Sequence, residues 1–100
     1  MPDPKGVIEI EALGRTWRLL FNNRAYRTIE KELGYELARV REGVHEVTVL
    51  LWGGLLAHHP DATLQTADEI IDELGYETIA GVISEALQQS PPLARKTSTS

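Results

Sequence analysis

Cysteine is absent from this chain of 100 residues, and no long hydrophobic segment is present. Without cysteine, a disulfide scaffold, a thiol nucleophile and a cysteine-ligated zinc site are excluded. The longest uncharged run near the middle, residues 47–57, is far shorter than the roughly 20 residues that span a bilayer. The opening residues, MPDPKG, lack the basic and then apolar order of a signal peptide. We therefore expect a cytoplasmic protein with no membrane-spanning segment.

Basic residues are scarce in the second half of the chain. Residues 1–50 hold eight Lys or Arg and eight Asp or Glu. Residues 51–100 hold two Lys or Arg and seven Asp or Glu, so the second half carries the whole net charge of −5. A DNA-binding surface needs Lys and Arg to neutralise phosphates. The basic residues of the first half are interleaved with glutamates, which indicates a solvated face of mixed charge. We expect no nucleic-acid partner, although the acidic half leaves a basic protein partner open.

The remaining composition is that of one ordinary globular domain. Hydrophobic residues make up 42% of the chain and charged residues 25%, and 100 residues predict a single domain. Residues 1–6 contain two prolines and no apolar pattern, which indicates a disordered N-terminus. Residues 91–100 begin with proline and read as a flexible tail. The folded domain is therefore expected over residues 7–90.

Two alternating segments predict an N-terminal β-hairpin over residues 7–21. Ile8 and Ile10 alternate with glutamates, and after a turn at Gly14 the apolar positions of the second segment fall on every other residue. This period of two is typical of strands with one buried face. Because a lone hairpin is marginally stable in water, its apolar face must pack on helices or on another chain.

Five helical segments are expected after the hairpin. Their apolar spacing and their capping residues place them at about residues 23–33, 37–41, 44–57, 66–74 and 77–89. Asn22 and Asn23 form an N-cap for the first of them, and Gly34 ends it. Thr66, with Glu69 three residues later, predicts a capping box for the fourth. The expected fold class is α+β, with a hairpin packed on a small bundle of about four helices.

The helix expected over residues 44–57 is apolar on almost every side. Such a helix is either surrounded by its own domain or sits at an interface. Gly53 and Gly54 weaken it, so we expect close approach of a neighbouring backbone. If some of the large apolar side chains stay exposed, they would bind a protein partner; otherwise they form the core. The candidate partner-binding residues are Trp17, Trp52, Leu51, Leu55 and Leu56.

Catalytic and metal-binding patterns are weak in this sequence. His58, His59 and Asp61 could bind a metal, joined by His45, but adjacent histidines on a loop diverge and the spacing matches no common zinc pattern. Asp68 and Asp72 share a helix face without any sign of a cleft. No phosphate-binding glycine motif or nucleophile elbow occurs. We therefore expect no catalytic residues, no metal and no cofactor.

The order of these pieces resembles the tail assembly chaperones of long-tailed bacteriophages, prophages and gene transfer agents. The resemblance covers about residues 7–90 and consists of apolar positions and helix caps. The segments that carry it are LLF (19–21), NRA (23–25), ELG (32–34), LLWGGL (50–55), HPD (59–61) with Leu64, TADEI (66–70) and EAL (85–87).

This resemblance implies a small, mostly helical, non-enzymatic protein that acts in the host cytoplasm. Proteins of this family bind the tape measure protein and keep it soluble while tail tube subunits polymerise around it. The implied partners are the tape measure protein and major tail tube subunits. The charge distribution separately leaves open a homo-oligomer, in which the basic end of one copy contacts the acidic helix of a second copy head-to-tail. Family members are generally absent from the finished tail, and many have a longer form made by frameshifting. A structural tail component that stays in the particle and a small host adaptor remain alternatives.

Overall fold

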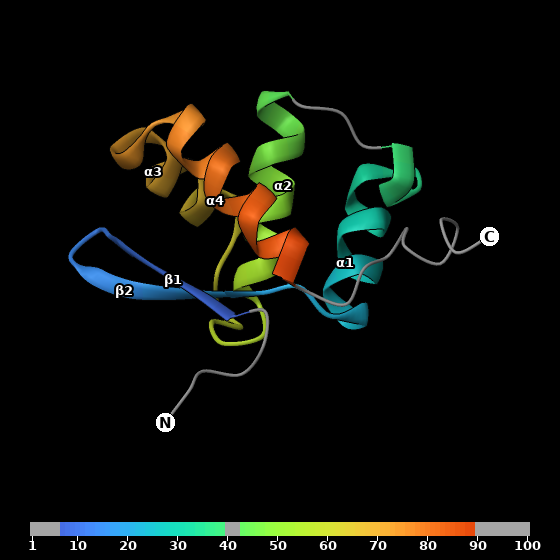
Figure 1. Ribbon diagram of the computed structural model, residues 1–100, viewed down its shortest axis with the longest axis horizontal. Coiled ribbons are helices and arrows are strands. Elements are labelled where there is room, and N and C mark those ends of the chain that lie inside the picture. The colour runs from blue at the N-terminus through green and yellow to red at the C-terminus, as the bar shows by residue number, and fades with distance from the viewer. Residues whose placement is uncertain (1–6, 40–42, 90–100) are drawn as a thin grey trace.

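The elements of the fold follow the expected order from hairpin to helices. The computed structural model describes residues 7–39 and 43–89. An α+β fold is confirmed, because an antiparallel hairpin precedes four α-helices (Figure 1). The expectations for residues 1–6 and 91–100 lie outside the described residues. The elements are β1 (Val7–Ala12), β2 (Arg15–Leu20), α1 (Asn23–Leu33), a single 3-10 turn η1 (Leu37–Arg39), α2 (Val44–Leu55), α3 (Leu64–Leu74) and α4 (Tyr76–Gln89).

The hairpin is closed by a two-residue turn. Leu13 and Gly14 have φ values of 54° and 76° between the paired residues Ala12 and Arg15. Positive φ at both central residues is what a type I′ turn requires, and this turn matches the twist of the strands. The turn sets a register in which Ile10 pairs with Trp17.

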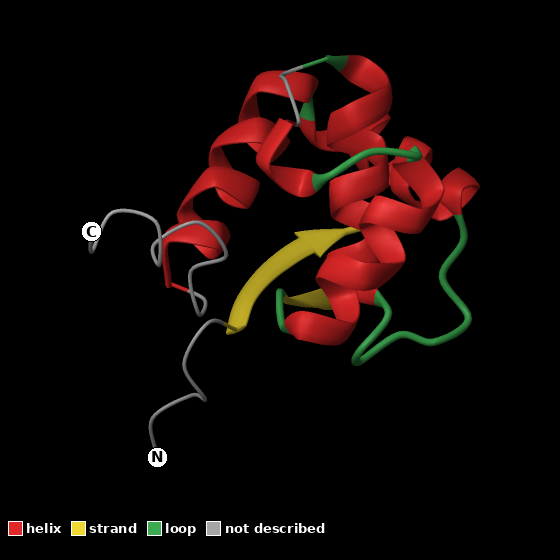
Figure 2. Cartoon of the chain, turned by 90° about the vertical axis from the view of Figure 1, so that its right-hand side faces the viewer, coloured by secondary structure: helices red, strands yellow, loops and turns green. Residues whose placement is uncertain are grey.

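That register sorts the side chains onto two faces. Ile10, Trp17 and Leu19 are buried, whereas Glu9 and Arg18 pair on the exposed face with 3.1 Å between Nε and Oε2. The apolar and polar residues that alternate in the sequence of the strands are therefore alternately buried and exposed in the structure. The hairpin lies along one side of the helices, which cover its apolar face (Figure 2).

Helix α2 occupies the centre of the molecule. It packs against α1, α3, α4 and β2, and its Val49, Leu51 and Leu55 are completely buried. The one buried polar residue of the described core is Thr48, whose hydroxyl donates a 2.8 Å hydrogen bond to the Val44 carbonyl one turn earlier. Neighbouring elements thus cover most of the apolar surface of α2, apart from exposed Val44 at its start and half-buried Trp52.

Two adjacent glycines of α2 allow this close packing. A Cβ atom on Gly53 would overlap the Ile29 side chain of α1, and one on Gly54 would lie 2.7 Å from Cζ of Phe21. The expected close approach of a neighbouring backbone is present at Gly53, where the Ala25 carbonyl oxygen of α1 is 3.7 Å from the added Cβ, within van der Waals contact. At Gly54 the nearest atoms belong to the Phe21 side chain, so a side chain and not a backbone makes the close approach there.

The caps of α1 lie where the sequence places them. The Asn22 Oδ1 atom accepts a 2.9 Å hydrogen bond from the Ala25 amide. At the other end, Gly34 has φ 85° and its amide donates to the Glu30 carbonyl. An N-cap side chain and a left-handed glycine thus satisfy backbone groups that the helix cannot pair internally.

The start of α3 differs from the prediction. The helix begins at Leu64, and its capping box joins Thr63 with Thr66 instead of Thr66 with Glu69. The Thr63 hydroxyl accepts from the Thr66 amide at 3.1 Å, and the Thr66 hydroxyl accepts from the Thr63 amide at 3.1 Å. Two threonines at this spacing satisfy each other's backbone, so Glu69 is left in the helix, where it accepts from Gln65.

Other boundaries shift by one or a few residues. The segment expected as a helix over 37–41 is described only as the 3-10 turn η1, because residues 40–42 lie outside the described part of the chain. Helix α2 ends at Leu55, two residues before the expected end, and α4 begins at Tyr76, one residue before the expected start. Gly75, with φ 98°, is the single residue between α3 and α4.

Within residues 7–39 and 43–89, no helix has both the length and the apolar character needed to cross a membrane.

Candidate functional site

The structure divides the five candidate partner-binding residues into two groups. Leu51 and Leu55 are completely buried and Trp17 is 6% exposed, so these three belong to the core of the free chain. Trp52 and Leu56 are half-buried. Only the second pair can meet a partner without rearrangement of the core.

Trp52 joins α2 to the segment that precedes α3. Its indole Nε1 donates a 3.2 Å hydrogen bond to the Ala62 carbonyl, and its ring packs against the core from the outside. The residue is therefore partly structural. An indole with a satisfied polar edge and a half-exposed ring is also typical of partner-facing tryptophans.

Leu56 lies in a groove between α1 and α2, which we call the α1–α2 groove. It has a volume of about 430 Å³. Its floor contains small residues from both helices and the turn after α2, and its rim contains Arg24, the one charged residue among those that line it. The lining residues are Asn22, Arg24, Ala25, Thr28, Gly53, Leu56, Ala57 and Pro60.

Small residues explain why a groove forms at this position. Gly53 and Ala25 let the two helices approach closely, and neither fills the surface depression above the contact. Ala57, just past the end of α2, is exposed. A hollow with an apolar floor and one cation at its rim suits an apolar side chain that is accompanied by a carboxylate.

A second hollow lies between β2 and the loop that follows α2. It has a volume of about 360 Å³, and its lining includes Arg15, Trp17, His59 and Asp61. The Arg15 guanidinium carbon lies 4.3 Å from the centre of the Trp17 ring, a cation–π arrangement. The centres of the Trp17 and His59 rings are 4.9 Å apart. The Trp17 indole donates to the Ala12 carbonyl at 2.8 Å, which fixes the ring at the hairpin turn.

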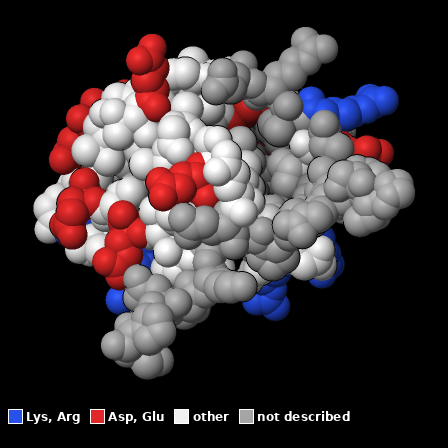
Figure 3. Space-filling model, viewed as in Figure 1, with Lys and Arg blue, Asp and Glu red and all other residues white. Residues whose placement is uncertain are grey.

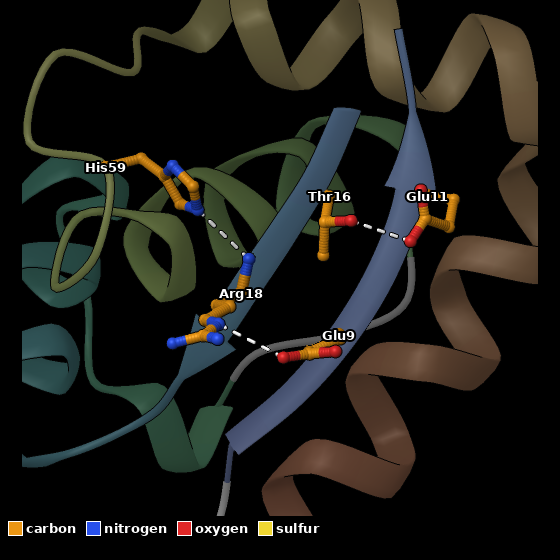
Figure 4. A network of polar contacts seen from close by, with 5 residues as sticks. All are labelled: Glu9, Glu11, Thr16, Arg18 and His59. Atoms are coloured by element: carbon orange, nitrogen blue, oxygen red, sulfur yellow. Dashed lines mark hydrogen bonds and ion pairs between the residues drawn. The ribbon is translucent and has the colours of Figure 1, made fainter. Parts of the chain in front are cut away.

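His59 connects this loop to the free edge of the hairpin. Its Nε2 atom accepts a 3.0 Å hydrogen bond from the backbone amide of Arg18 (Figure 4). Since Nε2 accepts, the neutral ring carries its proton on Nδ1. Nη2 of Arg15, 3.4 Å from Nδ1, is also a donor, so this contact is not a hydrogen bond. The loop thus satisfies one amide of an edge strand that would otherwise be open.

The surroundings of His59 favour its neutral form. Burial lowers the pKa of His59 from 6.5, and the positive charges of Arg15, His58 and Arg18 lower it further. A protonated ring could not accept from the Arg18 amide. The structural role of His59 was not visible in the sequence, because Trp17 and Arg18 are about 40 residues away along the chain.

The structure brings His58, His59 and Asp61, considered for a metal site, to the lining of the second hollow, but it does not arrange them to hold a metal ion. Within the described residues, no group of three or more His, Asp or Glu side chains is arranged to hold a metal ion. His58 and Asp61 line the second hollow, whereas Asp68 and Asp72 are exposed on α3 and line neither hollow.

Charge is distributed unequally over the surface. Most of the acidic side chains in Figure 3 lie on the left of the view, where α3 and the hairpin lie, and fewer lie at its centre and right. Arg24, Arg27 and Lys31 are exposed on α1, at the opposite side of the molecule from α3. The exposed acids of α3 are Asp68, Glu69, Asp72 and Glu73.

The fold and the two hollows define a small α+β domain with a partly open apolar groove. The chain matches no known protein family, curated protein or solved structure at a significant level.

Proposed function

We propose that this protein is a non-enzymatic tail assembly chaperone of a long-tailed phage, prophage or gene transfer agent. It binds the tape measure protein in the host cytoplasm and keeps it soluble while tail tube subunits assemble. Support comes from the resemblance over residues 7–90. The observation that carries the binding role is the α1–α2 groove, in which Leu56 is half-buried beside exposed Ala57.

The physical requirement of such a chaperone is an accessible apolar surface. A long helical partner exposes an apolar stripe until its assembly is complete, and a groove between two helices can cover part of that stripe. Leu56 supplies the apolar contact inside the groove in this proposal, and Arg24 supplies a partner for a carboxylate next to the stripe. Trp52, half-buried on the same helix but outside the groove lining, adds apolar surface. The buried residues Trp17, Leu51 and Leu55 hold the fold that presents the groove.

Co-expression with the neighbouring genes tests this proposal. The tagged chain is expected to co-purify with a long, helical, tape-measure-like protein and to keep that protein in the soluble fraction. Leu56→Glu, which places a charge in the groove, should abolish both effects. Ser84→Glu adds the same charge at an exposed position of α4 that lines neither hollow, and it should retain both effects.

Two outcomes would contradict the proposal. Recovery of the chain in purified particles would favour a structural tail component. Recovery of host proteins alone, with no tape-measure-like protein, would favour a small adaptor. Circular dichroism of each variant establishes that a loss of binding is not a loss of folding.

A further inference from the structure

The hairpin turn presents an apolar side chain that its own chain covers only in part. Leu13 and Val44 are the large hydrophobic residues that the described part of the chain leaves exposed, at 37% and 71%. Leu13 lies in the left-handed region, with φ 54°, where asparagine or glycine is the usual residue of a type I′ turn. A leucine at this position is locally unfavourable, so its side chain is a candidate contact.

The turn that carries Leu13 is held in place by α3. The Leu13 amide donates a 2.9 Å hydrogen bond to Oε1 of Glu73 near the C-terminal end of α3. The Trp17 indole donates to the Ala12 carbonyl, which belongs to the same peptide group as the Leu13 amide. Leu13 therefore projects from a fixed backbone, and a contact made through it would not need to order a flexible loop.

The α1–α2 groove offers the matching surface. Its lining combines Ala25, Gly53, Leu56, Ala57 and Pro60 with polar Asn22 and Thr28, and a volume of about 430 Å³ leaves room for a leucine side chain. Arg24 is the one charged residue in its lining. Beside Leu13, the turn carries Glu73, whose carboxylate accepts the Leu13 amide, and Glu11 is exposed on the adjoining strand. The turn that presents the Leu13 side chain, here called the knob, thus has two carboxylates near it, while the neighbouring Arg15 guanidinium stacks over the Trp17 ring, 4.3 Å from its centre. The groove contributes the Arg24 guanidinium.

We propose that Leu13 of one copy inserts into the α1–α2 groove of a second copy of this chain, with Arg24 of the second copy facing the carboxylates beside Leu13. The two surfaces lie on different parts of one molecule, because the hairpin turn and α1 are at opposite ends of the view (Figure 1). The contact is therefore head-to-tail. It leaves one free turn and one free groove in every complex, so it extends into a ring or a filament.

This inference does not rest on the proposed function, because it concerns the chain alone. If a partner helix also uses the groove, it has to displace Leu13 of the neighbouring copy. Self-association would then cover the apolar groove until a partner arrives.

Sedimentation velocity of the full chain at increasing concentration is the first test. The wild-type chain is expected to form species larger than a dimer as concentration rises. Leu13→Asn removes the knob but suits the left-handed turn, and it should weaken association about tenfold or more. Val44→Asn removes the other exposed hydrophobic residue and should leave association unchanged. A monomeric wild type, or an equal effect of the two substitutions, would overturn the proposal.

Mixing two defective variants tests the head-to-tail arrangement. Ala57→Glu keeps the knob but places a carboxylate in the groove, opposite the acids of the incoming turn. At a concentration where the wild type associates but each variant alone is monomeric, an equimolar mixture of Leu13→Asn and Ala57→Glu should form a dimer and nothing larger. Such a dimer joins the intact groove of one variant to the intact knob of the other. A mixture that stays monomeric, while both variants keep their circular dichroism spectra, would refute the contact.

Discussion

Gly54 controls how closely Phe21 approaches the central helix. A Cβ atom there would lie 2.7 Å from Cζ of the buried Phe21 ring. We expect Gly54→Ala to lower the free energy of unfolding by about 1–3 kcal/mol, because overpacking a filled core outweighs the gain in helix propensity. Chemical denaturation measures the change.

The matched control is Gly81→Ala in α4, where an added Cβ meets no atom within 4 Å. This substitution should raise the free energy of unfolding by about 0.5–1 kcal/mol, because alanine is the better helix former. If both variants were stabilised equally, Phe21 would not be packed against α2 as described.

Leu13 also makes a prediction about stability. Its φ of 54° costs an L-residue other than Asn or Gly roughly 1 kcal/mol. Leu13→Asn should therefore leave the monomer as stable as the wild type or more stable, by up to about 1 kcal/mol in chemical denaturation at low concentration. A clear loss of stability would mean that Leu13 contributes to the core of its own chain.

His59 links stability to pH. Burial and neighbouring positive charges lower the pKa of His59 from 6.5, so the folded state binds the proton less tightly than the unfolded state does. The stabilising contribution of neutral His59 is fully present above pH 6.5 and is lost as the pH falls through the lowered pKa. We expect the free energy of unfolding to decline over this acidic range.

Comparison with two variants isolates the histidine from the carboxylates that titrate at lower pH. His59→Gln keeps a hydrogen-bond acceptor near the Arg18 amide but does not titrate, so its stability should decline less on acidification than that of the wild type. His58→Gln changes the exposed neighbour and should leave most of the decline in place. Equal declines in the wild type and His59→Gln would contradict the role of His59.

At the scale of the elements, the caps of α3 give a direct test. Thr63 accepts from the Thr66 amide at the start of the helix. Thr63→Ala should lower the free energy of unfolding by about 1 kcal/mol, because it leaves an amide of the first turn without its capping partner. Glu69→Ala should change it by less than about 0.5 kcal/mol, because Glu69 lies beyond the cap. The opposite order would restore the capping box expected from the sequence.

Local patterns explain which elements could be predicted. The hairpin and α1 were accessible because alternation, Asn22 and Gly34 act within a few residues of one another. The start of α3 could not be predicted in this way, because Thr63 and Thr66 can both act as an N-cap residue. Only the reciprocal hydrogen bonds between them show that Thr63 is the N-cap.

Contacts between distant segments limited the prediction of the site. Sequence spacing could not distinguish buried Leu55 from half-buried Leu56, because that difference depends on where α1 crosses α2. It likewise could not show that His59 lies against Trp17. Trp52 and Leu56 alone among the five candidate residues offer surface to a partner, and Arg24, which was not among the candidates, lines the groove beside Leu56.

For the whole molecule, the separation of charge suits partners of both signs. The acids of α3 and the bases of α1 lie at opposite sides of the fold, so a neighbouring copy can present acids where this copy presents bases (Figure 3). Interactions between exposed charges are screened beyond roughly 10 Å at 0.1 M salt. Salt should therefore weaken any association that uses Arg24 while leaving the apolar contact of the groove in place.

The shared core also predicts that the hairpin and the helices unfold together. Trp17 in β2 and the residues of α2 belong to one cluster of buried side chains, and a two-stranded hairpin has little stability of its own.

Trp52→Phe leaves Trp17 as the fluorescent reporter of the hairpin, and Trp17→Phe leaves Trp52 as the reporter of α2. In each variant, tryptophan fluorescence and far-ultraviolet circular dichroism should change at the same denaturant concentration. Because the two probes are compared within one variant, the destabilisation caused by the substitution cancels. A Trp17 transition that precedes the loss of helix would show that the hairpin detaches first, and the groove and the turn could then no longer be treated as parts of one rigid body.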